Sequence, residues 1–167
     1  MAGERLEPSW WQRQMQRVAA SRPGSWLFSQ GLHHVDRVLL AASGGRASMP
    51  GVLAGLPVVR LTTTGAKTGR ERTHPVLGLP DGEKWVLVAS NWGQDHHPAW
   101  YHNLRANPAV ELTHEDETDE YVAREATGQE RTDYWDRVTD LYVGFEPYQR
   151  RSGDRDIPVV VLEPAAD

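Results

Sequence analysis

Short runs of apolar residues, separated by turn residues, dominate the chain from residue 57 onward. Many of these runs are rich in β-branched side chains, which favour strands, and glycine, proline and Asp-Gly pairs separate them. We predict about six strands, over the ranges 57–64, 71–79, 84–90, 109–115, 118–125 and 157–164. The pair Asp81-Gly82 predicts a hairpin turn, so the chain here forms an antiparallel meander and not a βαβ unit.

Two helical stretches are expected before the first strand. Residues 8–20 carry Trp10 and Trp11 on an imperfect apolar stripe, and residues 25–42 carry Trp26 with further apolar residues at helical spacing. A segment rich in glycine and proline then interrupts the helical periodicity. The three tryptophans look exposed, so we expect them to cover a substrate pocket, a partner subunit or a membrane surface.

Further helices are expected between and after the strands. Pro98 opens a short helix, which ends at residues 107–108, an Asn-Pro pair. Residues 127–130 match a capping box, in which a Thr hydroxyl and a Glu carboxylate satisfy N–H groups at the start of a helix. We expect Gly144 and Pro147 to end that helix, before a short turn or helix.

Antiparallel strands of this length must close into a barrel or be covered, because their edges are otherwise open to pairing. We therefore predict an α+β fold with a small closed or partly open barrel. The chain of 167 residues is expected to form a single domain, 1–167. Within it, 1–50 would be a helical arm with a loop, and 56–164 would be the barrel core.

Composition narrows the function. A net charge of −5 argues against general nucleic-acid binding. The chain has no cysteine, which excludes disulfides, thiolate metal sites and thiol nucleophiles. We see no apolar run long enough to span a membrane and no signal-peptide core, so we expect a cytoplasmic protein, with peripheral membrane contact left open.

A basic loop follows the first predicted strand. Gly65 and Gly69 frame a turn that carries Lys67, Arg70 and Arg72. Backbone N–H groups in such a turn can face an anion while basic side chains close around it. The loop lacks the spacing of a Walker motif or a dinucleotide fingerprint. The sequence therefore predicts a binding site for an anionic ligand.

The segment 89–107, ASNWGQDHHPAWYHNLRAN, resembles the middle motif of the deazaflavin-dependent nitroreductase family. LTTTGAKTGRERTHP upstream, and ATGQERTDYWDRVTDLYVGFEPYQRR and DIPVVVLEP downstream, extend the resemblance over residues 56–164. The resemblance implies a split β-barrel that binds reduced coenzyme F420, an 8-hydroxy-5-deazaflavin. It also implies hydride transfer to a quinone, an enone or other conjugated alkene, or a nitroarene.

The resemblance also implies which residues hold the cofactor. Cations would bind its phosphate and anionic tail, backbone N–H groups of 89–91 would face its ring, and a wall of residues from Pro98 onward would lie beside both. The implied cofactor-binding residues are Lys67, Thr68, Arg70, Arg72, His74, Pro75, Ala89, Ser90, Asn91, Pro98, Ala99, Trp100 and Tyr101. For one of Trp100 and Tyr101 we expect packing on the barrel instead.

Hydride addition to a conjugated acceptor develops negative charge at its far end, so a nearby hydroxyl would assist. We expect this catalytic donor to be Ser90, Tyr142 or Tyr148. The substrate pocket is expected to contain Trp26, Tyr142, Phe145 and Tyr148. The chain has Phe145 where several family members have tyrosine, which puts nitroarene reduction in doubt. It also has Asn91-Trp92 where the family commonly has Lys-Gly.

Other interpretations stay open. The same barrel could bind a flavin-like, haem or lipid ligand without turnover, or use FMN, although the motifs favour the deazaflavin. His96, His97 and His102 lie close in sequence, but their spacing does not fit a metal site on a helix face. We therefore predict no metal. The expected partner is a small-molecule acceptor, and the protein would be a monomer or a homodimer.

Overall fold

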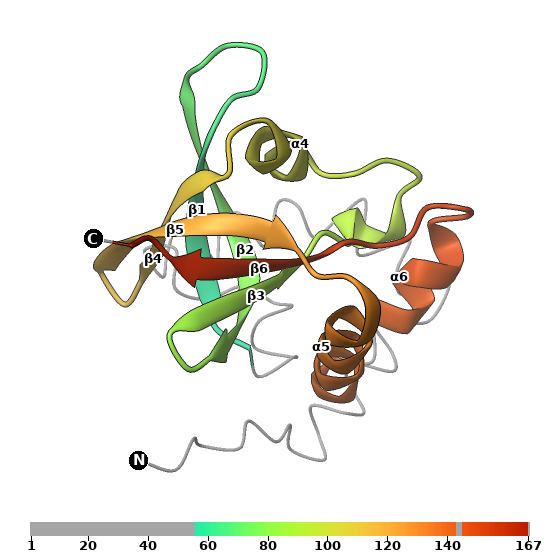
Figure 1. Ribbon diagram of the computed structural model, residues 1–167. Helices are drawn as coiled ribbons and strands as arrows, with labels where there is room; N and C mark the ends of the chain where they lie inside the picture. The colour runs from blue at the N-terminus through green and yellow to red at the C-terminus, as the bar shows by residue number, and fades with distance from the viewer. Residues whose placement is uncertain (1–55, 143–144, 167) are drawn as a thin grey trace.

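The computed structural model describes residues 56–142 and 145–166. The predictions for the N-terminal arm, with Trp10, Trp11 and Trp26, and for Gly144 lie outside these residues. The described strands form a closed barrel in the order β1-β2-β3-β6-β5-β4, and every neighbouring pair is antiparallel (Figure 1). The predicted barrel is thus confirmed, in its closed form.

The observed strands match the predicted ranges closely. They are β1 (Val58–Thr64), β2 (Glu71–Asp81), β3 (Lys84–Val88), β4 (Ala109–His114), β5 (Glu117–Glu125) and β6 (Val159–Pro164). The tight turn at Gly82, with φ of +65°, connects β2 to β3 as the Asp-Gly pair predicts. Glu115 and Asp116 form the turn between β4 and β5, and the acidic residues that follow them, up to Glu120, are part of β5.

The helices surround the barrel. They are the short 3₁₀ helix η1 (Asn91–Gly93) and the α-helices α4 (Ala99–Ala106), α5 (Gly128–Leu141) and α6 (Phe145–Arg151). Figure 1 shows α4 near the base of the projecting β1–β2 hairpin, and α5 and α6 together beside the barrel. No helix in the described ranges is long and apolar enough to cross a membrane.

Two local predictions for the later helices are wrong. Thr127 is the N-cap of α5, but its side chain makes no capping hydrogen bond. The Glu130 carboxylate instead accepts two hydrogen bonds from the Arg124 guanidinium, each 2.7 Å, because this bidentate pair is stronger than a single cap bond. Pro147 does not break a helix, since it lies in the first turn of α6, where its missing N–H has no partner to lose.

Strand β6 connects two hydrophobic cores. Val160 and Leu162 belong to a cluster that fills the barrel and includes α4. Val159 and Val161 belong to a second cluster beneath α5 and α6. All four side chains are fully buried. A strand buried on both faces reads as a continuous apolar run, as IPVVVLEP does.

Candidate active site

A cleft of about 650 Å³ lies between the barrel and its helices. This volume is typical of small-molecule sites. Its lining comes from four parts of the chain. These are the paired strands β1 and β2, the end of β3 with the loop that follows it, the start of α4, and the end of α5 with α6. The lining residues are Val58, His74, Pro75, Val76, Leu77, Val88, Ser90, Asn91, Trp92, His96, His97, Pro98, Ala99, Trp100, His102, Tyr142, Phe145 and Tyr148.

One wall of the cleft is aromatic. The Tyr142 and Phe145 rings meet edge to face with centroids 5.1 Å apart, and Phe145 meets Tyr148 at 6.3 Å. The two tyrosine hydroxyls are 2.9 Å apart, so one donates a hydrogen bond to the other. Burial raises the pKa of both phenols. Both hydroxyls therefore stay protonated at neutral pH and can act as donors.

The two tyrosines differ in what surrounds them. The Arg151 guanidinium lies 4.9 Å from the centre of the Tyr148 ring. The hydrogen bond with Tyr142 and the charge of Arg151 both oppose the rise that burial causes in the pKa of Tyr148. For Tyr142, the hydrogen bond and charge of Tyr148 add to the effect of burial on its pKa. The charge of Arg151 lowers the pKa of Tyr142 as well, but its guanidinium lies against the Tyr148 ring.

The loop after β3 forms a second wall of the cleft and has an unusual backbone. Asn91 and Trp92 have φ of +45° and +58°, in the left-handed region that favours glycine. A Cβ on Gly93 would come within 2.8 Å of backbone atoms of Tyr148, so only glycine fits there. Left-handed residues other than glycine cost roughly 1 kcal/mol or more each, and they cluster at functional sites. The close contact between Gly93 and Tyr148 joins the two walls.

Four imidazoles line the cleft, those of His74, His96, His97 and His102. Of these, only His74 was predicted near the cofactor, and the sequence signal that could have found the others is the pair His96-His97 beside Pro98. Burial, with the charge of Arg72 second, lowers the pKa of His74. No group of three or more potential ligands could hold a metal ion within the described part of the chain.

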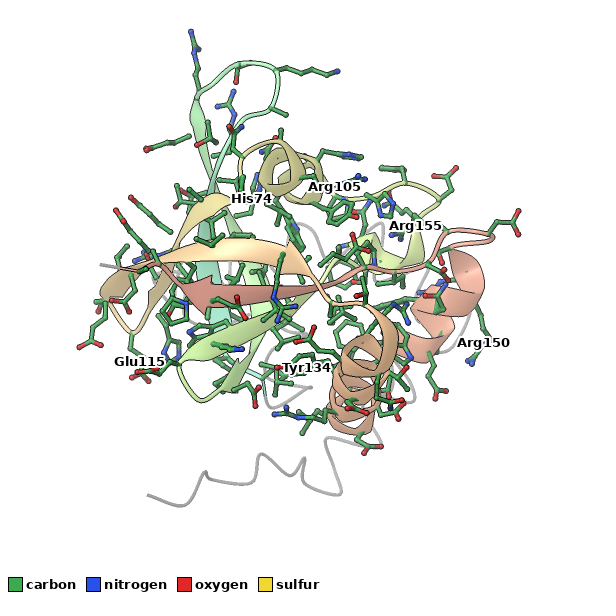
Figure 2. The ribbon with its side chains drawn as sticks, in the orientation of Figure 1. His74, Arg105, Glu115, Tyr134, Arg150 and Arg155 are labelled. Carbon is green, nitrogen blue, oxygen red and sulfur yellow. The ribbon has the colours of Figure 1, made fainter. Side chains whose placement is uncertain are left out.

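The basic loop is outside the cleft lining. Lys67, Arg70 and Arg72 are exposed at and near the tip of the β1–β2 hairpin, which projects from the barrel (Figure 1). None of these cations makes an ion pair with another described residue. The effect of Arg72 on the pKa of His74 shows that the loop and the cleft are electrostatically close. Figure 2 shows His74 and Arg105 at this end of the molecule.

Asn103 in α4 attaches the hairpin to the rest of the fold. Its Oδ1 accepts a hydrogen bond from the Ala66 N–H at 3.1 Å, and its Nδ2 donates to the Thr63 hydroxyl at 3.0 Å. Asn103 and Thr63 are both buried. The asparagine of the WYHNL motif therefore positions the basic loop, a role that the sequence analysis did not assign to it.

Three other predicted site residues are placed as follows. Ala89 is buried, and its N–H donates to the Pro158 carbonyl, so it cannot face a cofactor ring. Trp100 and Tyr101 both belong to the barrel core cluster, and of the two only Trp100 also lines the cleft. The Tyr101 hydroxyl donates to Glu125 at 2.7 Å, and burial, aided by this carboxylate, raises its pKa to about 12. Trp26 lies outside the described residues.

Comparisons with known proteins agree with this geometry. The model of the family "F420H(2)-dependent quinone reductase" matches residues 34–164. A protein of that description from Mycobacterium tuberculosis is 38% identical over 110 residues, which are 64% of this chain and 72% of the relative.

Two solved structures are also similar. One, described as an F420-H2 dependent reductase, is 38% identical with a TM-score of 0.59 and covers 64% of this chain and 93% of its own. Another, described as a domain-swapped dimer, is 33% identical with a TM-score of 0.59 and covers 84% of this chain and 99% of its own. The split-barrel fold implied by the sequence resemblance is confirmed. The chain belongs to the F420H(2)-dependent quinone reductase family.

Proposed function

We propose that this protein transfers a hydride from reduced coenzyme F420 to a quinone or a similar conjugated acceptor. The observation that carries the proposal is the cleft between His74-Pro75 and the loop after β3, with a basic hairpin beside it whose cations pair with no described residue. The cleft has apolar lining residues, and exposed cations lie on the hairpin beside it. This combination suits a ligand with a flat ring and an anionic tail.

The residues present fit that cofactor. Leu77, Val88 and Trp92 give the cleft apolar surfaces against which a planar ring system can lie. The hairpin supplies Lys67 and Arg72 as exposed cations without carboxylate partners among the described residues. Charged hydrogen bonds to a phosphate would satisfy them. The tail would therefore lie along the hairpin and the ring inside the cleft.

The bound cofactor would supply the hydride, and the protein would supply orientation and a proton. The aromatic wall places two protonated phenols where an acceptor can lie beside the ring. Negative charge develops on the acceptor oxygen as hydride arrives, and a donor hydroxyl stabilises it. We assign this donor to Tyr148, with Tyr142 donating to the phenolate that forms. Ser90 also lines the cleft and is the alternative donor.

Reoxidation of the reduced cofactor tests the proposal. Purified protein is mixed with reduced F420, and the return of the oxidised absorbance is followed after addition of a quinone, an enone or a nitroarene. We expect fast reoxidation with the quinone, and the rate should fall in Tyr148→Phe with little change in cofactor affinity. The Arg150→Gln variant serves as a control, because Arg150 is exposed on α6 and is outside the cleft lining.

Three outcomes would contradict the proposal in different ways. Binding of F420 without reoxidation by any acceptor would favour a non-catalytic carrier. Turnover with reduced FMN but not with reduced F420 would identify an FMN reductase. Loss of rate in Ser90→Ala but not in Tyr148→Phe would identify Ser90, and not Tyr148, as the donor hydroxyl. The cytoplasmic location, membrane contact and oligomeric state stay predictions.

A further inference from the structure

Arg155 lies in the segment between α6 and β6, and its side chain reaches the loop after β3, which lines the cleft. Its Nε donates to the Gln94 carbonyl at 3.0 Å and its Nη2 to the Ser90 carbonyl at 2.8 Å. Its Nη1 donates to the Ala89 carbonyl at 3.2 Å. Figure 2 shows Arg155 between the loop that leads to α4 and the α6 side of the molecule. One guanidinium thus holds three carbonyls of a backbone with two left-handed residues.

The main chain of Arg155 is itself fixed. The Ser152 hydroxyl donates to the Arg155 carbonyl at 2.7 Å, and the Gln149 amide donates to the same carbonyl at 2.9 Å. Ser152 is 2% exposed. Gln149 also accepts from the Ile157 N–H at 2.9 Å. The guanidinium is therefore presented by a rigid turn that follows directly on α6, the helix that carries Tyr148.

Arg155 also determines the state of His97. Its Nη1 is 3.1 Å from Nδ1 of His97. A guanidinium has only donors, so Nδ1 must accept and cannot carry a proton. The neutral ring then carries its proton on Nε2. His97 lines the cleft, and its ring packs against that of Tyr101 with centroids 4.7 Å apart, which limits its rotation.

We propose that Arg155 is a positioning residue that fixes the loop from Ala89 to His97 and holds His97 as an uncharged imidazole whose Nε2–H donates to a ligand oxygen. A neutral donor suits a carbonyl or hydroxyl oxygen of the cofactor or acceptor better than it suits a phosphate. The identity of that ligand rests on the proposed function. The Arg155–His97 pair does not, since it is formed without any ligand.

The charges around His97 determine the direction in which its pKa is shifted. Burial and the charge of Arg155 are the largest causes that lower its pKa, and His102 and Arg105 on α4 act in the same direction. Glu125 on β5 opposes them. The neighbouring His96 pairs with Asp95 at 2.9 Å. Removal of the Arg155 charge should therefore raise the pKa of His97.

The first test needs no activity. Imidazole nitrogen NMR of the ligand-free wild-type protein, with the His97 signals assigned from their loss in His97→Phe, reports which ring nitrogen carries the proton. We expect protonated Nε2 and bare Nδ1 at neutral pH. We expect His97 to titrate at higher pH in Arg155→Gln, and Arg155→Lys, which keeps the charge, to stay nearer the wild type. Protonated Nδ1 in the wild type would overturn the proposal, whether or not the variants fold.

The second test measures ligand binding. We expect Arg155→Gln and His97→Phe each to weaken binding of oxidised F420 about tenfold, with unchanged affinity in Arg150→Gln. The double variant should be little weaker than either single one if Arg155 acts through His97. Wild-type affinity in both single variants would overturn the role of the pair at the cleft. The expected tautomer without any F420 binding would leave the pair standing and refute the cofactor in the proposed function.

Discussion

At the residue scale, the cationic residues and the aromatic residues occupy different parts of the site. The cations belong to the hairpin, outside the cleft lining, and the edge-to-face rings of Tyr142, Phe145 and Tyr148 form the aromatic wall. Changes on the hairpin should therefore affect affinity for an anionic ligand, and changes on the aromatic wall should affect the choice of acceptor. Two sets of variants separate these effects.

We expect Lys67→Ala and Arg72→Ala each to weaken F420 binding by about 1.5–3 kcal/mol, because each removes one charged hydrogen bond. Both side chains are exposed, so the free energy of unfolding should hardly change. Fluorescence titration of the cofactor measures the affinity, and thermal unfolding checks the fold. Affinity that matches the wild type in both variants would mean that the tail binds elsewhere.

Phe145→Tyr adds a hydroxyl to a ring that is 3% exposed and lines the cleft. We expect a gain or change in nitroarene turnover, since the new hydroxyl can donate to a nitro oxygen. Cofactor affinity should stay within about twofold, because the change is remote from the hairpin cations. Steady-state kinetics with a nitroarene and a quinone measure the turnover. A change in affinity alone would remove Phe145 from the acceptor site.

The sequence was most informative about residue types at the cleft and least about their orientation. His74, Pro75, Ser90, Pro98 and Trp100 were chosen from motifs and do line it. Arg155 was missed, because its partners are mostly backbone carbonyls more than fifty residues away in sequence. A motif shows which side chains occur together, but not which of them hold a loop in place.

At the scale of elements, the β1–β2 hairpin is part of the barrel through pairing with β4 and β3, and its tip is attached to α4. Asn103 is the link, and it is the kind of buried amide whose hydrogen bonds must all be satisfied. Strand ranges and the helix opened by Pro98 followed from local patterns, because turn and proline signals are local. The Glu130–Arg124 pair, which replaces the expected cap, joins the end of β5 to the first turn of α5 six residues on, and no turn or capping pattern indicates it.

We expect Asn103→Leu to destabilise the fold by about 1–3 kcal/mol, because it leaves the Ala66 N–H and the Thr63 hydroxyl without this partner. It should also weaken F420 binding, since the basic loop loses its attachment. Asn103→Asp, which keeps the acceptor for Ala66, should weaken binding less. Chemical denaturation and cofactor titration measure the two effects. Stability loss with wild-type affinity would separate the hairpin position from cofactor binding.

At the scale of the whole molecule, β6 supplies side chains to both cores. The barrel and the helical layer should therefore unfold together. We expect Leu162→Ala to lower the free energy of unfolding by about 2–5 kcal/mol through the cavity that it leaves. Val122→Ala is the matched control on neighbouring β5, because Val122 is 45% exposed, and its effect should be within about 0.5 kcal/mol.

Denaturation followed both by tryptophan fluorescence and by far-ultraviolet circular dichroism tests this coupling. Coincident transitions in the wild type and in Leu162→Ala are expected for a two-state domain. If the two probes gave different transition midpoints in Leu162→Ala, the two cores would unfold independently.

The tip of the projecting hairpin is attached to α4 through the two hydrogen bonds of Asn103, and it contributes no side chain to either core. Substitutions of its exposed side chains, such as Lys67 and Arg70, should therefore change the free energy of unfolding little, unlike substitutions of Gly65 and Gly69. Related proteins can diverge in the charge and length of this loop, and hence in the cofactor tail that they accept, while the barrel sequence stays under separate selection.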